Sequence, residues 1–208
     1  MGRSDSGGML PTWNLSLGMD VDGMGMGKRP ATYTDLEELP PNMVGEIIAG
    51  ELYASSRPAI PHSRAYSRLG GVLMGPFDLG WNGPGGWLIF DEPELHLGED
   101  VLVPDLAGWR RERLPEAPRT AALTVAPDWA CEILSPSTEA HDRVVKLPLY
   151  AREGIRHVWL VDPDVRTLEV FRLTDTNYTL IASYAEDALI RAEPFDALEF
   201  TLGILWGR

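Results

Sequence analysis

Apolar residues in the central part of the chain recur at two spacings, one typical of helices and one typical of strands. Residues 32–41 predict a short helix, in which Thr34 and Glu37 form a capping box before a Pro-Pro pair ends it. Residues 43–55 predict a β-hairpin that turns at an Ala-Gly pair. The chain therefore alternates between helical and extended segments from the start of its patterned region.

Two longer helices and several strands follow. In residues 62–77, Tyr66, Leu69 and Val72 share one face, which predicts an amphipathic helix. Residues 138–153 predict a second helix, closed by Gly154. Further apolar runs predict strands at 86–97, 101–109, 128–135 and 178–186, and a strand pair at 157–173. Strands mixed with helices in this order predict an α/β fold, with a mixed sheet and helices on its faces.

The first 30 residues differ from the rest. They hold seven of the 21 glycines and five of the seven methionines, without a helical or strand period. We expect residues 1–30 to be a disordered tail and residues 31–208 to form one domain. A phosphate-binding loop at 22–30 is excluded, because Asp22 replaces its first glycine and Arg29 replaces its Ser or Thr.

Charge and cysteine content limit the expected cellular location and binding partners of the protein. The net charge is −13, and residues 29–208 carry −12 of it, so general coating of nucleic acid is not expected. One cysteine excludes an internal disulfide framework, and a reducing cytoplasm is the expected location. No apolar run approaches the roughly 20 residues that cross a bilayer, so no membrane partner is expected.

Two carboxylates interrupt apolar strands. Asp105 lies within VLVPDLAGW and Glu132 within WACEILS. A buried charge is normally paired, protonated or bound to metal, and two carboxylates on one sheet could converge on Mg²⁺ or Mn²⁺. Each carboxylate could instead face solvent or belong to a buried ion pair, and the pattern alone leaves these alternatives open.

Lys146 is a candidate partner for these carboxylates. Glu132 lies about 10 Å before the end of its strand, and Lys146 lies about 12 Å into the following helix. If the helix turns back along the strand, Lys146 reaches the level of Glu132. Asp142 and Tyr150 lie four positions to either side of Lys146, on the same helical face. A solvated Lys146 and a core Tyr150 are the alternatives.

Several motifs resemble one known family. The segments GEIIAGEL, VPDLAGW, CEILSPST and DRVVKLPLYAREGIRHVWLVDP resemble the Uma-two family of proposed endonucleases, within the PD-(D/E)xK, restriction-endonuclease-like superfamily. The resemblance extends from about residue 31 to 205. It places the PD motif on Pro104-Asp105 and the acidic residue of (D/E)xK on Glu132. Leu134 stands where that motif has its lysine. The resemblance implies that Lys146, in the next helix, takes the place of that lysine.

The resemblance implies a fold and an activity. It implies a restriction-endonuclease-like core, with a central mixed sheet of about four strands flanked by helices and a peripheral β-meander. It also implies hydrolysis of DNA phosphodiester bonds with Mg²⁺ or Mn²⁺, which Asp105 and Glu132 would hold. Lys146 would orient the attacking water or stabilise charge on the phosphate. Glu46 matches an N-terminal acidic position of the family, and a homodimer is expected by analogy.

Three residues are candidates for contact with the nucleic-acid backbone. His62, Arg64 and Arg68 lie near the start of the first long helix, where they could form a local basic strip. A solvated helix end is the alternative. The acidic net charge keeps two other functions open: a non-catalytic binding module on a nuclease fold, and a hydrolase of another phosphoester such as RNA.

Overall fold

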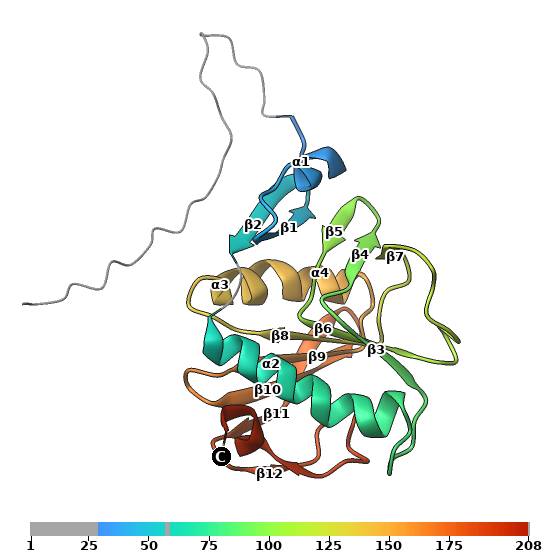
Figure 1. The fold of residues 1–208 in the computed structure, drawn as a ribbon, viewed down its shortest axis with the longest axis vertical. Helices are drawn as coiled ribbons and strands as arrows, with labels where there is room; N and C mark the ends of the chain where they lie inside the picture. The colour runs from blue at the N-terminus through green and yellow to red at the C-terminus, as the bar shows by residue number, and fades with distance from the viewer. Residues whose placement is uncertain (1–28, 57–58, 208) are drawn as a thin grey trace, which may run out of the picture.

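The fold is built around one six-stranded mixed sheet (Figure 1). The computed structural model describes residues 29–56 and 59–207, so the tail predicted at 1–30 lies almost wholly outside the described residues. The strand order is β11-β10-β9-β8-β6-β3. β8 and β9 pair in parallel, and every other neighbouring pair is antiparallel. The strands are β3 (Trp87–Asp91), β6 (Leu106–Arg110), β8 (Trp129–Ile133), β9 (His157–Asp162), β10 (Thr167–Thr174) and β11 (Asn177–Ala185).

The parallel pair requires a connection that crosses one face of the sheet. This crossover consists of α3 (Glu139–His141), a π-helical turn η2 (Asp142–Lys146) and α4 (Leu147–Arg152). The opposite face is covered by α2 (Ile60–Leu73), which continues into a second π-helical turn, η1 (Met74–Asp78). Figure 1 shows the sheet between α2 and the crossover, so the fold has three layers. The predicted α/β class and mixed sheet are confirmed, with six strands instead of about four.

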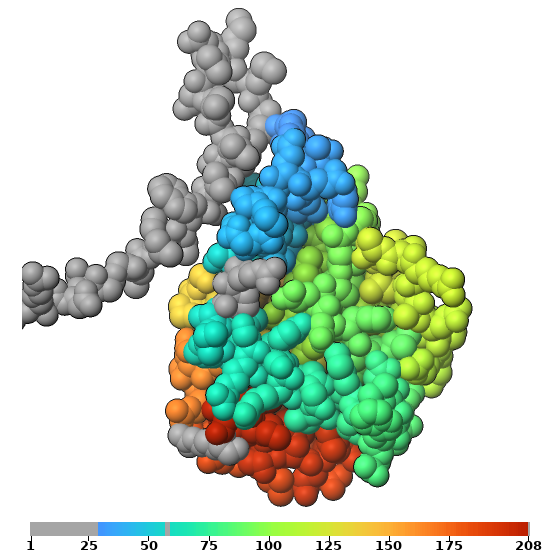
Figure 2. All heavy atoms as spheres, viewed as in Figure 1, coloured from blue at the N-terminus to red at the C-terminus, as the bar shows by residue number. Residues whose placement is uncertain are grey.

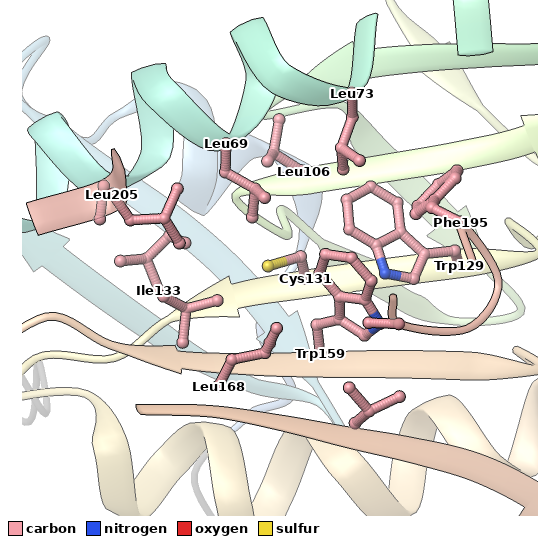
Figure 3. Packing of buried hydrophobic residues seen from close by; sticks show 14 of the residues in the cluster. Leu69, Leu73, Leu106, Trp129, Cys131, Ile133, Trp159, Leu168, Phe195 and Leu205 are labelled. Atoms are coloured by element: carbon pink, nitrogen blue, oxygen red, sulfur yellow. The ribbon is translucent and has the colours of Figure 1, made fainter. Parts of the chain in front are cut away.

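The core on the α2 side accounts for the apolar pattern of that helix. Leu69 and Leu73 point from α2 toward the sheet, where they pack in the same cluster as Trp129 and Trp159 (Figure 3). Cys131 is fully buried in this cluster. The C-terminal segment completes the cluster through Phe195, Leu202 and Leu205. Its elements are β12 (Leu189–Ile190), β13 (Phe200–Thr201) and the 3₁₀ helix η3 (Leu202–Trp206).

A second, five-stranded sheet lies above the crossover helices. Its order is β2-β1-β5-β4-β7, and the β1–β2 hairpin projects from the body of the molecule (Figure 2). The predicted hairpin is confirmed, and its two turn residues, Ala49 and Gly50, both have positive φ. The strands are β1 (Met43–Ile48), β2 (Glu51–Ser56), β4 (Glu94–Leu97), β5 (Asp100–Leu102) and β7 (Ala122–Leu123).

The prediction of two long strands at 86–97 and 101–109 was wrong. Each segment is divided into two short strands, of which β3 and β6 belong to the large sheet and β4 and β5 to the small one. The breaks fall at Pro93 and Pro104, which have no N–H group to donate to a strand ladder. Glu92 adopts a positive φ beside the first break. One long hairpin is therefore shared between two sheets.

Two predicted helix details also need correction. The first helix is α1 (Tyr33–Glu37), and its cap is Thr32 with Asp35, because Asp35 accepts the Thr32 N–H at 2.7 Å. The helix predicted at 138–153 is not regular, since η2 interrupts it directly before Pro148. Within the described residues, no helix combines the length and apolar character needed to cross a bilayer.

Candidate active site

Asp105 directly precedes β6, and Glu132 lies in the neighbouring strand β8 of the large sheet. β6 and β8 pair with Leu106 opposite Cys131, so Asp105 and Glu132 follow one step along the same register. Side chains alternate between the faces of a sheet, so both carboxylates leave the face on which Leu106 and Cys131 are buried. Asp105 Oδ2 accepts the Ile133 N–H at 2.7 Å, which fixes its orientation. The convergence predicted for these two residues is therefore present.

Lys146 extends from the crossover to the carboxylate of Glu132. Its Nζ lies 2.8 Å from Glu132 Oε1 and 3.0 Å from Glu46 Oε1, and the lysine side chain is 4% exposed. The predicted return of Lys146 to the level of Glu132 is confirmed. Asp142 also faces the ammonium group, at 3.9 Å. Burial disfavours the charged lysine, but the carboxylates of Glu132 and Glu46 outweigh it and raise its pKa well above the usual value.

Tyr150 holds the same oxygen of Glu132. Its fully buried hydroxyl donates a hydrogen bond to Glu132 Oε1. Burial raises the pKa of the Tyr150 hydroxyl, and the Glu132 carboxylate raises it further. Burial also raises the pKa of Glu132 well above its ordinary value, although Lys146 acts in the opposite direction. Both described contacts of Glu132 involve Oε1, which leaves Oε2 outside them.

Glu46 and Asp142 complete the buried charges. Glu46 Oε1 accepts the Val103 N–H at 2.8 Å in addition to contacting Lys146. Burial would raise the pKa of Glu46, but Lys146 and its hydrogen bonds hold it below the ordinary value. Burial raises the pKa of Asp142, with Lys146 opposing this effect. The pKa of Glu46 is therefore lowered beside Lys146, whereas the pKa of Asp142 stays raised despite the same lysine.

The candidate nucleic-acid contacts separate into two places. His62 lies at the site, with its Nε2 3.3 Å from Asp105 Oδ1. Arg68 instead donates a hydrogen bond to the carbonyl of Ile204 in η3. Arg64 is exposed, and its guanidinium lies beside Gly207. The structure does not place either arginine in the lining of the cavity described next.

One cavity of about 710 Å³ is lined by Glu46, His62, Asp105, Glu132, Asp142 and Lys146. Its lining includes residues of the β1–β2 hairpin, residues of the segment from Ser135 to His141, and the carboxylates. His141, which the sequence did not single out, has its Nε2 3.7 Å from Glu46 Oε2. A histidine at the end of the three-residue helix α3 gives no recognisable signal in the sequence, and only the fold brings it to the cavity.

The donor set suits a hard divalent cation. Asp105 and Glu132 supply carboxylate oxygens on one cavity wall, and Mg²⁺ is commonly held by one or two carboxylates, with waters and phosphates completing its shell. Within residues 29–56 and 59–207, no three His, Cys, Asp or Glu side chains form a ready-made cage. The residues present therefore fit an open magnesium site, and not a closed structural one.

The protein has a mixed sheet with two carboxylates at neighbouring positions, and the crossover brings a lysine to one of them. These features place it in the class of α/β proteins with a restriction-endonuclease-like core. The chain belongs to the Uma2 family, described as "Putative restriction endonuclease", whose family model matches residues 30–203. The fold is similar to the crystal structure of a "putative nuclease belonging to DUF820" from Anabaena variabilis. That match has a TM-score of 0.65 and 24% identity, and it covers 85% of this chain and 98% of the other. No curated protein matches the chain.

Proposed function

We propose that the protein is a metal-dependent endonuclease that hydrolyses DNA phosphodiester bonds. The observation that carries the proposal is the group of Asp105, Glu132 and Lys146 in one cavity, with Lys146 Nζ 2.8 Å from Glu132. Membership of a family described as restriction endonucleases supports it. These residues are also the ones that the sequence motifs nominate.

In this proposal Asp105 and Glu132 hold Mg²⁺ or Mn²⁺. When bound there, such a cation would supply a charge that polarises the phosphate and lowers the pKa of a coordinated water. Lys146 places its positive charge beside the charge that develops on the phosphate, where a preorganised cation lowers the barrier. Tyr150 fixes Glu132 through Oε1, so that Oε2 can serve the metal.

Glu46 and Asp142 have supporting roles. Both face the Lys146 ammonium group, Glu46 at 3.0 Å and Asp142 at 3.9 Å. They keep the lysine charged and limit the rotamers that it can adopt inside the cavity. Glu46 could also hold a water near the metal, because it lines the same cavity.

The direct test is cleavage of supercoiled plasmid DNA by the full chain with Mg²⁺ or Mn²⁺. Glu132→Gln and Lys146→Met keep the side-chain size while removing the proposed ligand and the charge. We expect each variant to lose at least about a hundredfold in rate, as is typical when a transition-state contact is removed. Glu199→Gln is a matched control, because Glu199 forms an exposed ion pair with Arg191.

The expected pattern is loss in both site variants and normal activity in the control, with thermal melting used to confirm folding. Cleavage that persists in Glu132→Gln and Lys146→Met would disprove the assigned roles. Chelation by EDTA should abolish cleavage by the wild-type protein, and cleavage that continues in EDTA would remove the metal from the proposal.

A non-catalytic binding module would not need carboxylates and a lysine gathered in one site. The compact arrangement of Asp105, Glu132 and Lys146 argues against that alternative. A hydrolase of RNA remains a separate candidate, and substrate screening with the same variants distinguishes it from a DNA endonuclease.

The proposal extends to the organisation of the protein. We propose that residues 31–208 act as one domain, that the protein forms a homodimer and that it works in the cytoplasm, where its one cysteine stays reduced. Light scattering after gel filtration measures the dimer, and limited proteolysis measures the domain bounds. A monomer at micromolar concentration would disprove the dimer alone.

A further inference from the structure

The cavity encloses the proposed reactive groups more than a surface cleft would. Glu132 is 4% exposed at its side chain, Glu46 12% and Asp105 15%. The cavity volume of about 710 Å³ falls within the roughly 300–1,000 Å³ of pockets that enclose small molecules. A phosphodiester must therefore enter the cavity to reach these groups. A single strand can bend its backbone into such a cavity more easily than a duplex, which is stiff over about 50 nm.

Two histidines that line the cavity have buried nitrogens without a partner at normal hydrogen-bond distance. His62 Nδ1 makes no hydrogen bond, and His141 Nε2 lies 3.7 Å from Glu46 Oε2. Buried polar atoms normally have a partner, so each unpaired atom calls for an explanation. The two residues contact different carboxylates, since His62 lies by Asp105 and His141 by Glu46. A polar ligand that fills the cavity would have hydrogen-bonding groups available on both sides of the site.

Two aromatic rings, one from β2 and one from α3, also line the cavity. The rings of Tyr53 and His141 lie 4.4 Å apart at 40°, and both residues line the cavity. Aromatic side chains bind unpaired bases by stacking, at about 1–3 kcal/mol for each base. The hydroxyls of Ser135 and Thr138 also line the cavity, 3.0 Å from each other. This combination of aromatic rings and hydroxyls is suited to an unstacked nucleotide.

We infer that the cavity binds single-stranded DNA in preference to duplex, with Tyr53 as a stacking surface and His141 as a hydrogen-bonding contact. This inference rests on the proposed nuclease function and specifies the substrate of the same site. Charge favours it as well. Among the described residues that line the cavity, Lys146 is the one Lys or Arg, and Glu46 and Glu132 neutralise it. Base stacking on Tyr53 would add affinity to the phosphate contacts that the site makes.

The test compares binding and cleavage of one labelled strand in two forms. A fluorescein-labelled strand of about 16 nucleotides, long enough for one binding site, is used alone and annealed to its complement. Binding to the full chain is measured by fluorescence anisotropy in Ca²⁺, a cation that occupies oxygen sites. Cleavage is measured in Mn²⁺. We expect the single strand to bind at least about tenfold more tightly and to be cut faster.

A matched pair of variants assigns the preference to the cavity. Tyr53→Leu removes the ring but keeps apolar bulk, and we expect it to weaken single-strand binding about fivefold or more. Tyr33→Leu makes the same change at an exposed tyrosine of α1 outside the cavity lining, and it should bind normally. Thermal melting of both variants checks that each is folded.

The outcomes separate this inference from the proposed function. Equal affinity for strand and duplex would overturn the inference, even if both are cleaved. Unchanged single-strand binding by folded Tyr53→Leu would overturn the role of the aromatic ring. Preferential binding without cleavage of either form would support the single-strand pocket and refute the proposed hydrolysis.

Discussion

Tyr150 is fully buried, and its hydroxyl donates a hydrogen bond to Glu132. Its ring belongs to the core cluster that contains Trp109 and Leu149. Its hydroxyl, in contrast, serves only the carboxylate group. The residue therefore joins the packing of the core to the orientation of the proposed metal ligand.

Tyr150→Phe tests this connection. Removing the hydroxyl leaves Glu132 with one partner fewer, so we expect a loss of about 1–3 kcal/mol in the free energy of unfolding. We also expect kcat to fall about tenfold with little change in KM, because the ligand is misplaced and DNA binding is not. Urea unfolding and steady-state kinetics measure both effects. Tyr184→Phe is the control, since that hydroxyl only meets the Arg191 carbonyl at the surface. An unchanged kcat in Tyr150→Phe would exclude the positioning role.

His157 provides a pH-dependent contribution to stability away from the site. It begins β9, and its Nε2 lies 3.2 Å from Glu193. Burial lowers the pKa of the imidazole below its usual value of about 6.5, although Glu193 raises it. The unfolded chain therefore takes up the proton first, so this stability is present above about pH 6.5 and is lost as pH falls through the folded pKa.

We expect the melting temperature of the wild-type protein to fall between pH 7 and pH 5 more steeply than that of His157→Gln. Thermal melts at several pH values measure the difference. His96→Gln is the control, because its side chain is about one-third exposed and pairs with Glu94 at the surface. Parallel pH profiles for wild type and His157→Gln would contradict this assignment.

Some contacts between individual residues could be predicted from the sequence, and others could not. The meeting of Glu132 and Lys146 followed from the rise of a strand and of a helix, because the two residues are joined by one strand-to-helix connection. The contacts of Glu46 with Lys146 and His141 could not be predicted in this way. They join a hairpin to a crossover about 100 positions later in the chain, and no local spacing encodes that distance.

Among the elements, the π-helical turn η2 decides where Lys146 points. Pro148 lacks an N–H, and the Leu147 N–H bonds instead to the Asp142 carbonyl, five residues earlier. A proline inside a helical segment indicates a kink, but it does not tell which form the kink takes. The turn contains both Asp142 and Lys146, so the irregularity lies within the site itself.

Pro148→Ala restores a donor and removes the ring clash, so the helix can return to a regular α-helix. One residue of a helix corresponds to about 100° of rotation, which would turn Lys146 away from Glu132. We expect DNA cleavage to fall about tenfold or more, while the free energy of unfolding stays within about 2 kcal/mol, because gained helix propensity offsets the lost ion pair. Pro115→Ala, in an exposed loop, is the control. Full activity in Pro148→Ala would show that the proline does not set the geometry.

The divided hairpin was beyond prediction for a different reason. Both halves have the apolar composition of strands, and only pairing with different neighbours separates β3 and β6 from β4 and β5. A proline inside an apolar run indicates a break, but it does not tell which sheet receives each half. Asp105 lies directly after the second break, so the same proline that divides the hairpin precedes the catalytic candidate.

For the whole molecule, the net charge of −13 opposes general binding of nucleic acid. If DNA enters the cavity as a single strand, few phosphates meet a cation. The association constant for single-stranded DNA then falls with salt by a logarithmic slope of about −0.7 for each neutralised phosphate. We expect a slope shallower than about −2, measured by anisotropy over a series of NaCl concentrations. A slope steeper than about −4 would reveal an extended basic surface outside the cavity.

The whole fold was predicted at the level of class and family, but the second sheet was not. The motifs around Asp105 and Glu132 indicated the central sheet and its crossover. The five-stranded sheet forms from short segments such as Ala122–Leu123, which are too short to show a period. The enclosure of the site, which depends on the β1–β2 hairpin of that sheet, therefore became apparent only in three dimensions.

The C-terminal segment fills the core behind the carboxylate strands, with Phe195 against Trp129 and Trp159. Every proposed site residue lies between positions 46 and 150, so synthesis on the ribosome delivers all of them before this packing can form. The strands that carry Asp105 and Glu132 gain their full support only when the last residues arrive. A growing chain would thus hold the proposed site residues without the packed core that aligns them, and the proposed cleavage would begin only after this core has formed.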